Sequence, residues 1–272
     1  MKKGKVFFVL IMLFTLNILF AYNADIKASY KNGIPILLYH HVSDEKTDLP
    51  ELTASSKEFD YQMKKLKDNG FSTITIEDLI KYMSNKFVIL PEKPIVITFD
   101  DGYEDNYTYA FPILKKYNFK ATVFMVGVNI DANNRLSKKQ MQEMAAYGID
   151  FGSHSITHSS LTSLDEKELH KEIKKSKKQI EQVINKEVVI FSYPYGNYDL
   201  NVLEKTQFNY KGAVTVLPGP AKSNYDNIFL LRRIPIFYDT DFEKLFELIN
   251  ENKAKEALLD YSPAINKKSF AE

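Results

Sequence analysis

The 272-residue sequence contains no cysteine. This absence excludes disulfide bonds, a thiolate metal site and the lipidated cysteine of a lipoprotein. Any metal must therefore be held by nitrogen and oxygen ligands. An excess of charge of one sign is absent too, because 36 basic side chains face 35 acidic ones. A net charge of +1 predicts no broad electrostatic attraction to nucleic acid or to anionic lipid.

Histidine and arginine are scarce, which makes the position of each one informative. The chain has five histidines. Two of them, His154 and His158, lie only four residues apart, and none follows His170. The three arginines are Arg135, Arg232 and Arg233.

The N-terminus has the pattern of an export signal. Lysines in the first five residues precede an almost wholly apolar run from Val6 to Tyr22. This run has the length of a signal-peptide core, and its place behind lysines disfavours a buried element of the fold. Two outcomes stay open: cleavage after Ala24, which the bulky Tyr22 opposes, or an uncleaved membrane anchor. Both predict an exported protein, extracellular or tethered to the outer face of the cytoplasmic membrane, with membrane contact only through this segment.

The rest of the chain is long enough for one domain with a full core. No internal repeat or low-complexity segment is present. We expect a signal peptide or anchor at 1–24, a linker at 25–33, a catalytic domain at 34–250 and a polar tail at 251–272.

Short apolar runs alternate with amphipathic segments throughout 34–250. A capping box, Ser55-x-x-Glu58, opens the first helix, which ends at Gly70. Regular alternation of this kind favours a parallel sheet, open or closed. The predicted strands are 34–39, 71–76, 95–99, 121–126, 149–152, 188–191, 213–216 and 229–234, and the other helices are 106–117, 137–147, 165–184 and 241–250.

Metal-binding side chains follow two of these strands. Asp100 and Asp101 end the strand at 95–99, and His154 and His158 follow the next but one. One carboxylate and two imidazoles leave a fourth position open for water, which is how hydrolytic metal sites are built. The second carboxylate would take the proton of that water. The alternatives are an Asp-Asp-Gly turn that caps a helix, and histidines in a surface turn.

These groups share one place in the predicted fold. Asp100, His154, Tyr195 and His40 each lie just past the carboxyl end of a predicted strand. In a β/α barrel, the loops at that end form the active site. The sequence therefore predicts one site built from several strands.

Three segments resemble the motifs of the NodB-homology polysaccharide deacetylases, carbohydrate esterase family 4. They are Thr98-Phe99-Asp100-Asp101-Gly102, His154-Ser155-Ile156-Thr157-His158 and Phe191-Ser192-Tyr193-Pro194-Tyr195-Gly196. The resemblance spans about 34–249 and implies an α/β fold, a distorted (β/α) barrel in a single domain, with a divalent metal. It implies removal of acetyl groups from N-acetylated sugars. The roles it implies are Asp101, His154 and His158 as metal ligands, Asp100 as base and the Tyr195 backbone N–H as oxyanion donor.

Tyr39-His40 resembles a pair on an early strand of the subgroup that acts on poly-N-acetylglucosamine exopolysaccharide. Many other members take an acid histidine from a late motif, which this chain lacks. The resemblance therefore implies that His40 protonates the leaving amine, a task that suits an imidazole. The alternative is a core histidine below the barrel mouth. His41 is expected to point elsewhere.

The third motif departs from the commonest family pattern. Ser192 stands where many members have an arginine that pairs with the catalytic aspartate. The adjacent Arg232 and Arg233, near the end of a late strand, are the nearest substitutes. Alternation along a strand turns only one of the two inward, and we favour Arg233. The alternative is a solvated basic strand end.

The residues predict metal-assisted hydrolysis, and the resemblance implies a metal-dependent hydrolase of linear amides that removes N-acetyl groups from N-acetylglucosamine-containing polysaccharide or oligosaccharide. Zinc suits the ligands, and cobalt, manganese or nickel would bind the same set. Two alternatives stay open: an O-acetyl esterase of acetylated xylan, and a catalytically silent carbohydrate-binding protein. The sequence does not separate peptidoglycan, exopolysaccharide and chitin fragments as substrates, and it does not indicate the oligomeric state.

Overall fold

The computed structural model describes residues 33–84, 88–222 and 227–250. The predicted signal peptide or anchor, nearly all of the predicted linker and the predicted polar tail lie outside the described residues. Among the described residues, no helix has the length and apolar character needed to cross a membrane.

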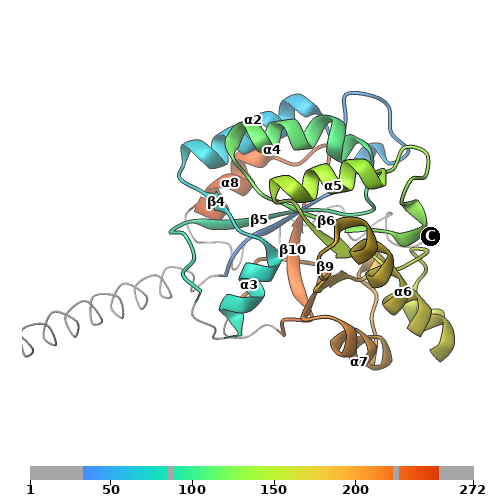
Figure 1. Cartoon of the computed structure of the whole chain (residues 1–272). Coiled ribbons are helices and arrows are strands. Elements are labelled where there is room, and N and C mark those ends of the chain that lie inside the picture. The colour runs from blue at the N-terminus through green and yellow to red at the C-terminus, as the bar shows by residue number, and fades with distance from the viewer. Residues whose placement is uncertain (1–32, 85–87, 223–226, 251–272) are drawn as a thin grey trace, which may run out of the picture.

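Seven parallel strands close into a barrel (Figure 1). Neighbours pair in the order β1-β10-β9-β8-β7-β6-β5, and β1 also pairs with β5, which completes the circle. At this seam Leu37 is in register with Ile97 on one side and with Ile234 on the other. The predicted (β/α) barrel is confirmed. Its strands are β1 (Ile36–Tyr39), β5 (Pro94–Phe99), β6 (Thr122–Met125), β7 (Asp150–Ser153), β8 (Ile190–Ser192), β9 (Gly212–Pro218) and β10 (Leu231–Pro235).

The barrel is distorted beside β5. The short strand β4 (Ser72–Thr73) pairs with the start of β5, at Pro94 and Ile95. Strand β6 pairs with the end of β5, at Thr98 and Phe99. Two different strands thus share the edge of β5 that faces away from β1.

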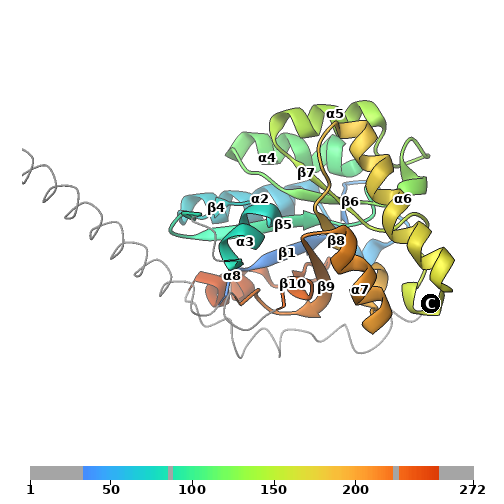
Figure 2. The same ribbon diagram turned by 60° about the horizontal axis from the view of Figure 1, so that its bottom comes forward.

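Helices surround the barrel, as Figures 1 and 2 show from two directions. In Figure 1, α2, α4 and α5 run along the top, and α6 and α7 lie at the lower right. Capping boxes fix several helix starts, including Ser55 with Glu58 in α2 and Asp165 with Glu168 in α6. The helices are α2 (Ser56–Asp68), α3 (Ile76–Met83), α4 (Phe111–Tyr117) after the π-helical turn η2 (Asn106–Ala110), α5 (Lys138–Tyr147), α6 (Glu166–Ile184), α7 (Leu200–Asn209) and α8 (Phe242–Asn250), and a small parallel pair joins β2 (His41–Val42) to β3 (Thr53–Ala54).

The sequence pattern misses α3 and α7. The strand expected at 71–76 is confirmed only at Ser72–Thr73, where β4 lies, and its expected length is wrong because Ile76 already begins α3. Thr75 and Asp78 form the capping box of α3, and aspartate is a weaker signature there than glutamate or glutamine. Helix α7 is capped by Asp199, but only two of its residues are buried, so its apolar periodicity is faint.

Every second side chain of a strand points into the barrel. Toward the amino ends of the strands these inward side chains are apolar, and we call them the lower layer. The members of this layer pack with Leu79 and Ile80 of α3, which closes the lower end of the barrel. The outward neighbours Ile97 and Phe99 pack instead with the surrounding helices. The lower layer consists of Ile36, Val96, Phe124, Ile190, Val214 and Leu231.

One step further along the same strands, the inward positions become polar. Thr98, Ser192 and Arg233 form this upper layer, and all three are fully buried. The guanidinium of Arg233 lies 5.5 Å from the ring centroid of Phe124, so the two layers are in contact. The upper layer therefore lies directly beneath the barrel mouth, which is formed by the loops at the carboxyl ends of the strands.

Candidate active site

Three predicted metal ligands converge at the barrel mouth. Oδ1 of Asp101 lies 3.6 Å from Nε2 of His154 and 3.4 Å from Nε2 of His158. The two Nε2 atoms are 3.2 Å apart. One carboxylate oxygen and two imidazole nitrogens therefore face a common point, which is a donor set that fits a divalent cation.

The imidazole of His154 is oriented for metal binding. Its Nδ1 lies 2.8 Å from the carbonyl oxygen of Ser192. A carbonyl only accepts hydrogen bonds, so Nδ1 carries the proton and Nε2 of the neutral ring keeps a free lone pair. That lone pair belongs to the nitrogen beside Asp101, as a ligand to a cation requires.

His158 is held as a neutral ring by its surroundings. Burial, and then the nearby His154, lowers the pKa of His158 to about 4. The backbone N–H of His158 donates to Oγ of Ser155 at 3.0 Å. The ring packs against Tyr195, with centroids 4.6 Å apart. Near neutral pH its Nε2 is therefore available as a ligand.

The mouth is built from a backbone that turns sharply. Asp101 has a φ of 70°, and Gly102 follows with a φ of 68°. A non-glycine residue seldom adopts this left-handed conformation, and such residues cluster at functional sites. The turn comes directly after Asp100, and it brings an oxygen of each adjacent carboxylate close to Nε2 of His154, at 3.7 Å for Asp100 and 3.6 Å for Asp101. The other left-handed residues at the mouth are Ser155, His158 and Tyr195.

Asp100 is buried and pinned by a guanidinium. Arg233 donates from Nη1 to Oδ1 and from Nη2 to Oδ2, both at 2.7 Å. The hydroxyl of Ser192 also donates to Oδ2, at 3.2 Å. Burial alone would raise the pKa of Asp100, but Arg233 and then His154 outweigh it, so the pKa lies well below its usual range. Asp100 is therefore ionised, and its Oδ2 lies 3.7 Å from Nε2 of His154.

The structure separates the two candidate arginines. Arg233 is 0% exposed and also donates from Nε to the carbonyl oxygen of Thr215 at 2.9 Å and from Nη2 to Oγ of Ser192 at 3.0 Å. Arg232 contacts instead the carbonyl oxygen of Pro218 and is only partly buried. Arg233 is thus the residue placed against the aspartate, and it is no solvated strand end. Ser192 leaves room for a guanidinium that arrives from β10.

His40 lies at the end of β1, close to both aspartates. Burial lowers its pKa, and the charges of Asp101 and then Asp100 partly offset that effect. Its Nδ1 is buried and makes no hydrogen bond within the described part of the chain. Its carbonyl oxygen accepts from Nδ2 of Asn106 at 2.8 Å. The acid role of His40 and the oxyanion role of the Tyr195 N–H stay predictions.

Comparison with known proteins identifies the family. The polysaccharide deacetylase family model matches residues 88–212. A protein of Bacillus subtilis (strain 168), named "Putative polysaccharide deacetylase YxkH", is 39% identical over 217 residues, which cover 79% of this chain and 75% of the relative. The chain belongs to the polysaccharide deacetylase family.

Other relatives of the deacetylase agree in sequence and in fold. The poly-beta-1,6-N-acetyl-D-glucosamine N-deacetylase of Staphylococcus epidermidis is 33% identical over 195 residues, covering 61% of this chain and 66% of that one. The solved structure of the Streptococcus pyogenes deacetylase PplD in complex with acetate has a TM-score of 0.74 at 31% identity, covering 80% of this chain and 98% of that one. The structure of IcaB from Ammonifex degensii, with a TM-score of 0.69 over 80% of this chain and 97% of that one, is 20% identical and shares the fold.

Sequence reasoning gave His41 no role, and the deacetylase places it in a polar network beside the mouth. Nδ1 of His41 lies 2.5 Å from Oδ2 of Asp105, and its Nε2 lies 3.1 Å from Oδ1 of Asp48. Its ring stacks on Tyr103, which Arg135 covers with its guanidinium 3.8 Å from the ring centroid. These five residues line a cavity of about 450 Å³. The partners lie far apart in the chain, so no local pattern could have revealed them.

Proposed function

We propose that this deacetylase removes N-acetyl groups from N-acetylglucosamine-containing polysaccharide, with a divalent cation held by Asp101, His154 and His158. The observation that carries the proposal is the convergence of these three ligand atoms, within 3.2–3.6 Å of one another, beside the ionised Asp100. The same donors favour zinc and accept cobalt, manganese or nickel.

Three further residues act on the acetamide. A divalent cation held by Asp101, His154 and His158 would lower the pKa of a water and polarise the acetyl carbonyl. Asp100, held in place by Arg233, accepts a proton from the attacking water. The backbone N–H of Tyr195 donates a hydrogen bond to the oxygen that becomes negative. His40 donates a proton to the nitrogen, so that acetate and a free amine are released.

The surroundings of the mouth support a saccharide substrate. The cavity lined by His41, Tyr103 and Arg135 carries carboxylates, hydroxyls and amides, which suit the hydroxyl groups of a sugar. Tyr103 lines this cavity and follows Asp101 by only two residues, so the cavity adjoins the proposed metal centre. The relative from Staphylococcus epidermidis bears the name of a deacetylase of poly-β-1,6-N-acetylglucosamine, which favours an exopolysaccharide.

We also propose that the deacetylase is exported. Support comes from the sequence alone, in the lysines and the apolar run that ends at Tyr22. Recovery of the protein from the culture medium or from the outer face of the membrane supports export, and recovery from the cytoplasm contradicts it.

Acetate release tests the proposed activity. Metal-free protein is reloaded with zinc, cobalt, manganese or nickel and incubated with poly-N-acetylglucosamine, peptidoglycan, chitin oligosaccharides or acetylated xylan. We expect metal-dependent release from an N-acetylated polymer, and none from an Asp100→Asn control. Release from acetylated xylan alone would contradict amide hydrolysis, and undiminished release by the metal-free protein would contradict the cation site.

A further inference from the structure

Helix α6 turns one carboxylate toward the loop that carries the two histidines. Glu172 is 8% exposed, and it is the charged member of the buried face of α6. Its Oε2 accepts hydrogen bonds from the backbone N–H groups of Ile156 and Thr157, both at 2.9 Å. Its Oε1 accepts from the hydroxyl of Thr157, also at 2.9 Å. Three donors of the loop between His154 and His158 thus meet one side chain.

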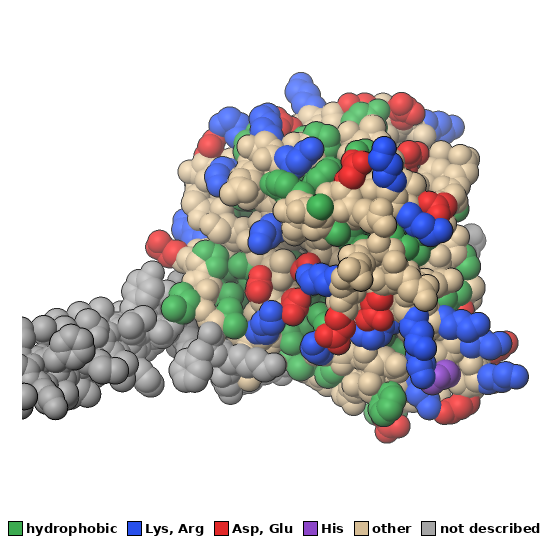
Figure 3. Space-filling view, in the orientation of Figure 1, with side chains coloured by type: hydrophobic (Ala, Val, Ile, Leu, Met, Phe, Trp, Pro, Cys, Tyr) green, Lys and Arg blue, Asp and Glu red, His purple; other side chains and the backbone are tan. Residues whose placement is uncertain are grey.

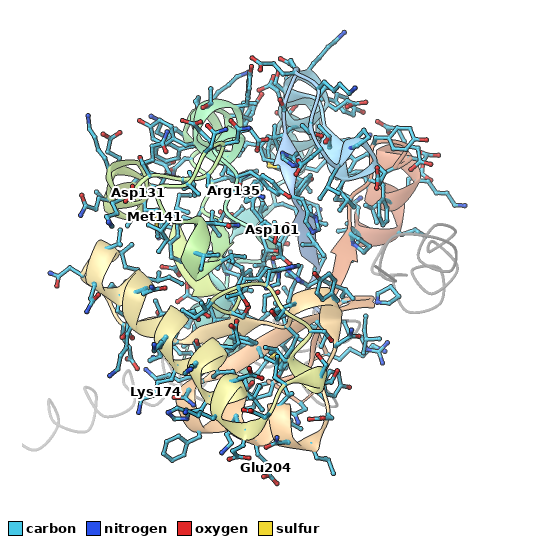
Figure 4. The ribbon with its side chains drawn as sticks, turned by 90° about the vertical axis from the view of Figure 1, so that its right-hand side faces the viewer. Asp101, Asp131, Arg135, Met141, Lys174 and Glu204 are labelled. Atoms are coloured by element: carbon cyan, nitrogen blue, oxygen red, sulfur yellow. The ribbon has the colours of Figure 1, made fainter. Side chains whose placement is uncertain are left out.

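The outer face of α6 has the opposite character. Lys171, Lys174 and Lys175 lie on it, and Figure 3 shows basic side chains gathered at the lower right, where α6 runs. Figure 4 places Lys174 on the outer side of the helix, away from Asp101. Glu172 thus lies on the buried side of a helix whose other charged residues are in contact with solvent, and its contacts with the loop account for this position.

The loop needs such an anchor, because its backbone is strained. Ser155 has a φ of 63° and His158 a φ of 60°, so two residues without the freedom of glycine are left-handed. On one side, the N–H groups of Gly127 and Val128 donate to the carbonyl oxygens of Ser155 and Ile156, at 3.0 and 2.9 Å. Glu172 holds the other side, where the N–H groups point.

Packing of α6 does not depend on Glu172. Leu169, Ile173 and Ile180 on the same helix are each at most 1% exposed and lie in the main hydrophobic core. Removal of one carboxylate leaves this apolar face in place. The contacts of Glu172 therefore serve the loop more than they serve the docking of the helix.

We propose that Glu172 is a positioning residue for the metal centre. It fixes the backbone at Ile156 and Thr157 so that Nε2 of His158 meets Asp101 and His154 at one point. The inference rests on the proposed metal centre and adds a residue that contacts neither the cation nor the substrate. Residues that orient metal ligands typically contribute about 10–100-fold to metal affinity.

Metal titration of the full-length protein tests this role. Zinc is titrated into metal-free wild type and into Glu172→Ala, Glu172→Asp and Glu172→Gln, in competition with a chromogenic chelator. We expect Glu172→Ala to weaken zinc binding about 10–100-fold. Glu172→Asp, one methylene shorter, should lose part of the affinity. Glu172→Gln should restore much of it, because its oxygen still accepts from both N–H groups and its nitrogen reaches the Thr157 hydroxyl.

Glu181→Ala is the matched control. Glu181 lies on the same helix and likewise accepts a backbone N–H, from Val188 at 3.0 Å, but this contact belongs to another loop. Both alanine variants should lower the melting temperature of the metal-free protein. Glu181→Ala should keep the zinc affinity of wild type and the visible spectrum of its cobalt complex, whereas Glu172→Ala should change both.

Distinct outcomes overturn distinct proposals. Wild-type zinc affinity in Glu172→Ala, or an equal loss in Glu181→Ala, would remove the positioning role and leave the proposed function intact. If Glu172→Ala does not fold, an unchanged affinity in Glu172→Asp decides against the role in the same way. Failure of wild type to bind any divalent cation would overturn the metal centre and this inference together.

Discussion

The lower and upper layers of the barrel interior are built on the same strands and serve different ends. The lower layer is apolar, and α3 closes it from below. The upper layer places Arg233 fully out of water and leaves its charge to be balanced by Asp100. A buried ion pair contributes little net stability compared with apolar packing, so its value lies in the position that it gives to the carboxylate. The lower layer therefore contributes stability, whereas the upper layer contributes the fixed position of the Asp100 carboxylate.

Removal of the charge at the top should have the largest effect on catalysis. Asp100→Asn keeps the shape of the side chain but cannot accept a proton, so turnover should fall by roughly 10²–10⁴. Bound metal, measured by atomic emission, should stay stoichiometric, because the proposed ligand is Asp101 and not Asp100. Loss of metal together with activity would show that the two aspartates have exchanged roles.

A cavity in the lower layer should affect stability instead. Phe124→Ala removes a fully buried ring and should lower the free energy of unfolding by about 3–5 kcal/mol, measured by urea denaturation. Zinc affinity of the folded protein should stay close to that of wild type.

Val96→Ala is the control for the contact between the layers, since Val96 lies in the lower layer without a ring against Arg233. It should cost less stability than Phe124→Ala. A loss of zinc affinity in Phe124→Ala alone would show that the layers do not act separately.

Replacement of His40, at the upper end of the barrel, should slow the cleavage of amides more than the cleavage of activated esters. Nitrogen leaves poorly unless it is protonated, whereas the phenolate of an activated aryl acetate leaves without a proton. His40→Ala should therefore depress amide cleavage by about 10²-fold, retain metal, and affect aryl acetate cleavage far less. Equal losses on the two substrates would contradict the acid role.

Acid should lower the stability of the metal-free protein through His158 at the barrel mouth. The pKa of His158 is lowered to about 4 in the folded chain, chiefly by burial, against about 6.5 when unfolded. The unfolded state therefore binds the proton more strongly between these values, and stability falls as the pH drops from 6.5 to 4. For the partly exposed ring this amounts to roughly 2–3 kcal/mol in the metal-free protein. Urea unfolding of wild type and of His158→Gln at pH 7.5 and 4.5 should show a smaller loss in the variant; parallel losses would contradict the assignment.

The residues that the sequence could predict are those whose signal is local. The aspartate pair and the histidine pair each lie within one short segment, and the strands before them alternate regularly. Arg233 could be predicted because the chain has only three arginines, so few could replace the arginine that many family members have at the position of Ser192. Glu172 and the pair of His41 with Asp105 depend on contacts between distant segments, which no spacing reveals. Helix α7 was missed because only two of its residues are buried, so its apolar periodicity is faint. Helix α3 was missed because its capping box closes with Asp78, a weaker start signal than glutamate or glutamine.

The helix at the base of the barrel has a consequence for how a polymer is handled. Because α3 and the lower layer fill the interior, the described part of the chain forms a bowl, without a tunnel through which a polymer could be threaded. We therefore expect a polysaccharide substrate to lie across the rim of the barrel, with flanking sugars on both sides of the site. Units in the middle of a strand then present their acetamides as readily as units at its ends, so deacetylation should be scattered along the polymer without waiting for a free terminus.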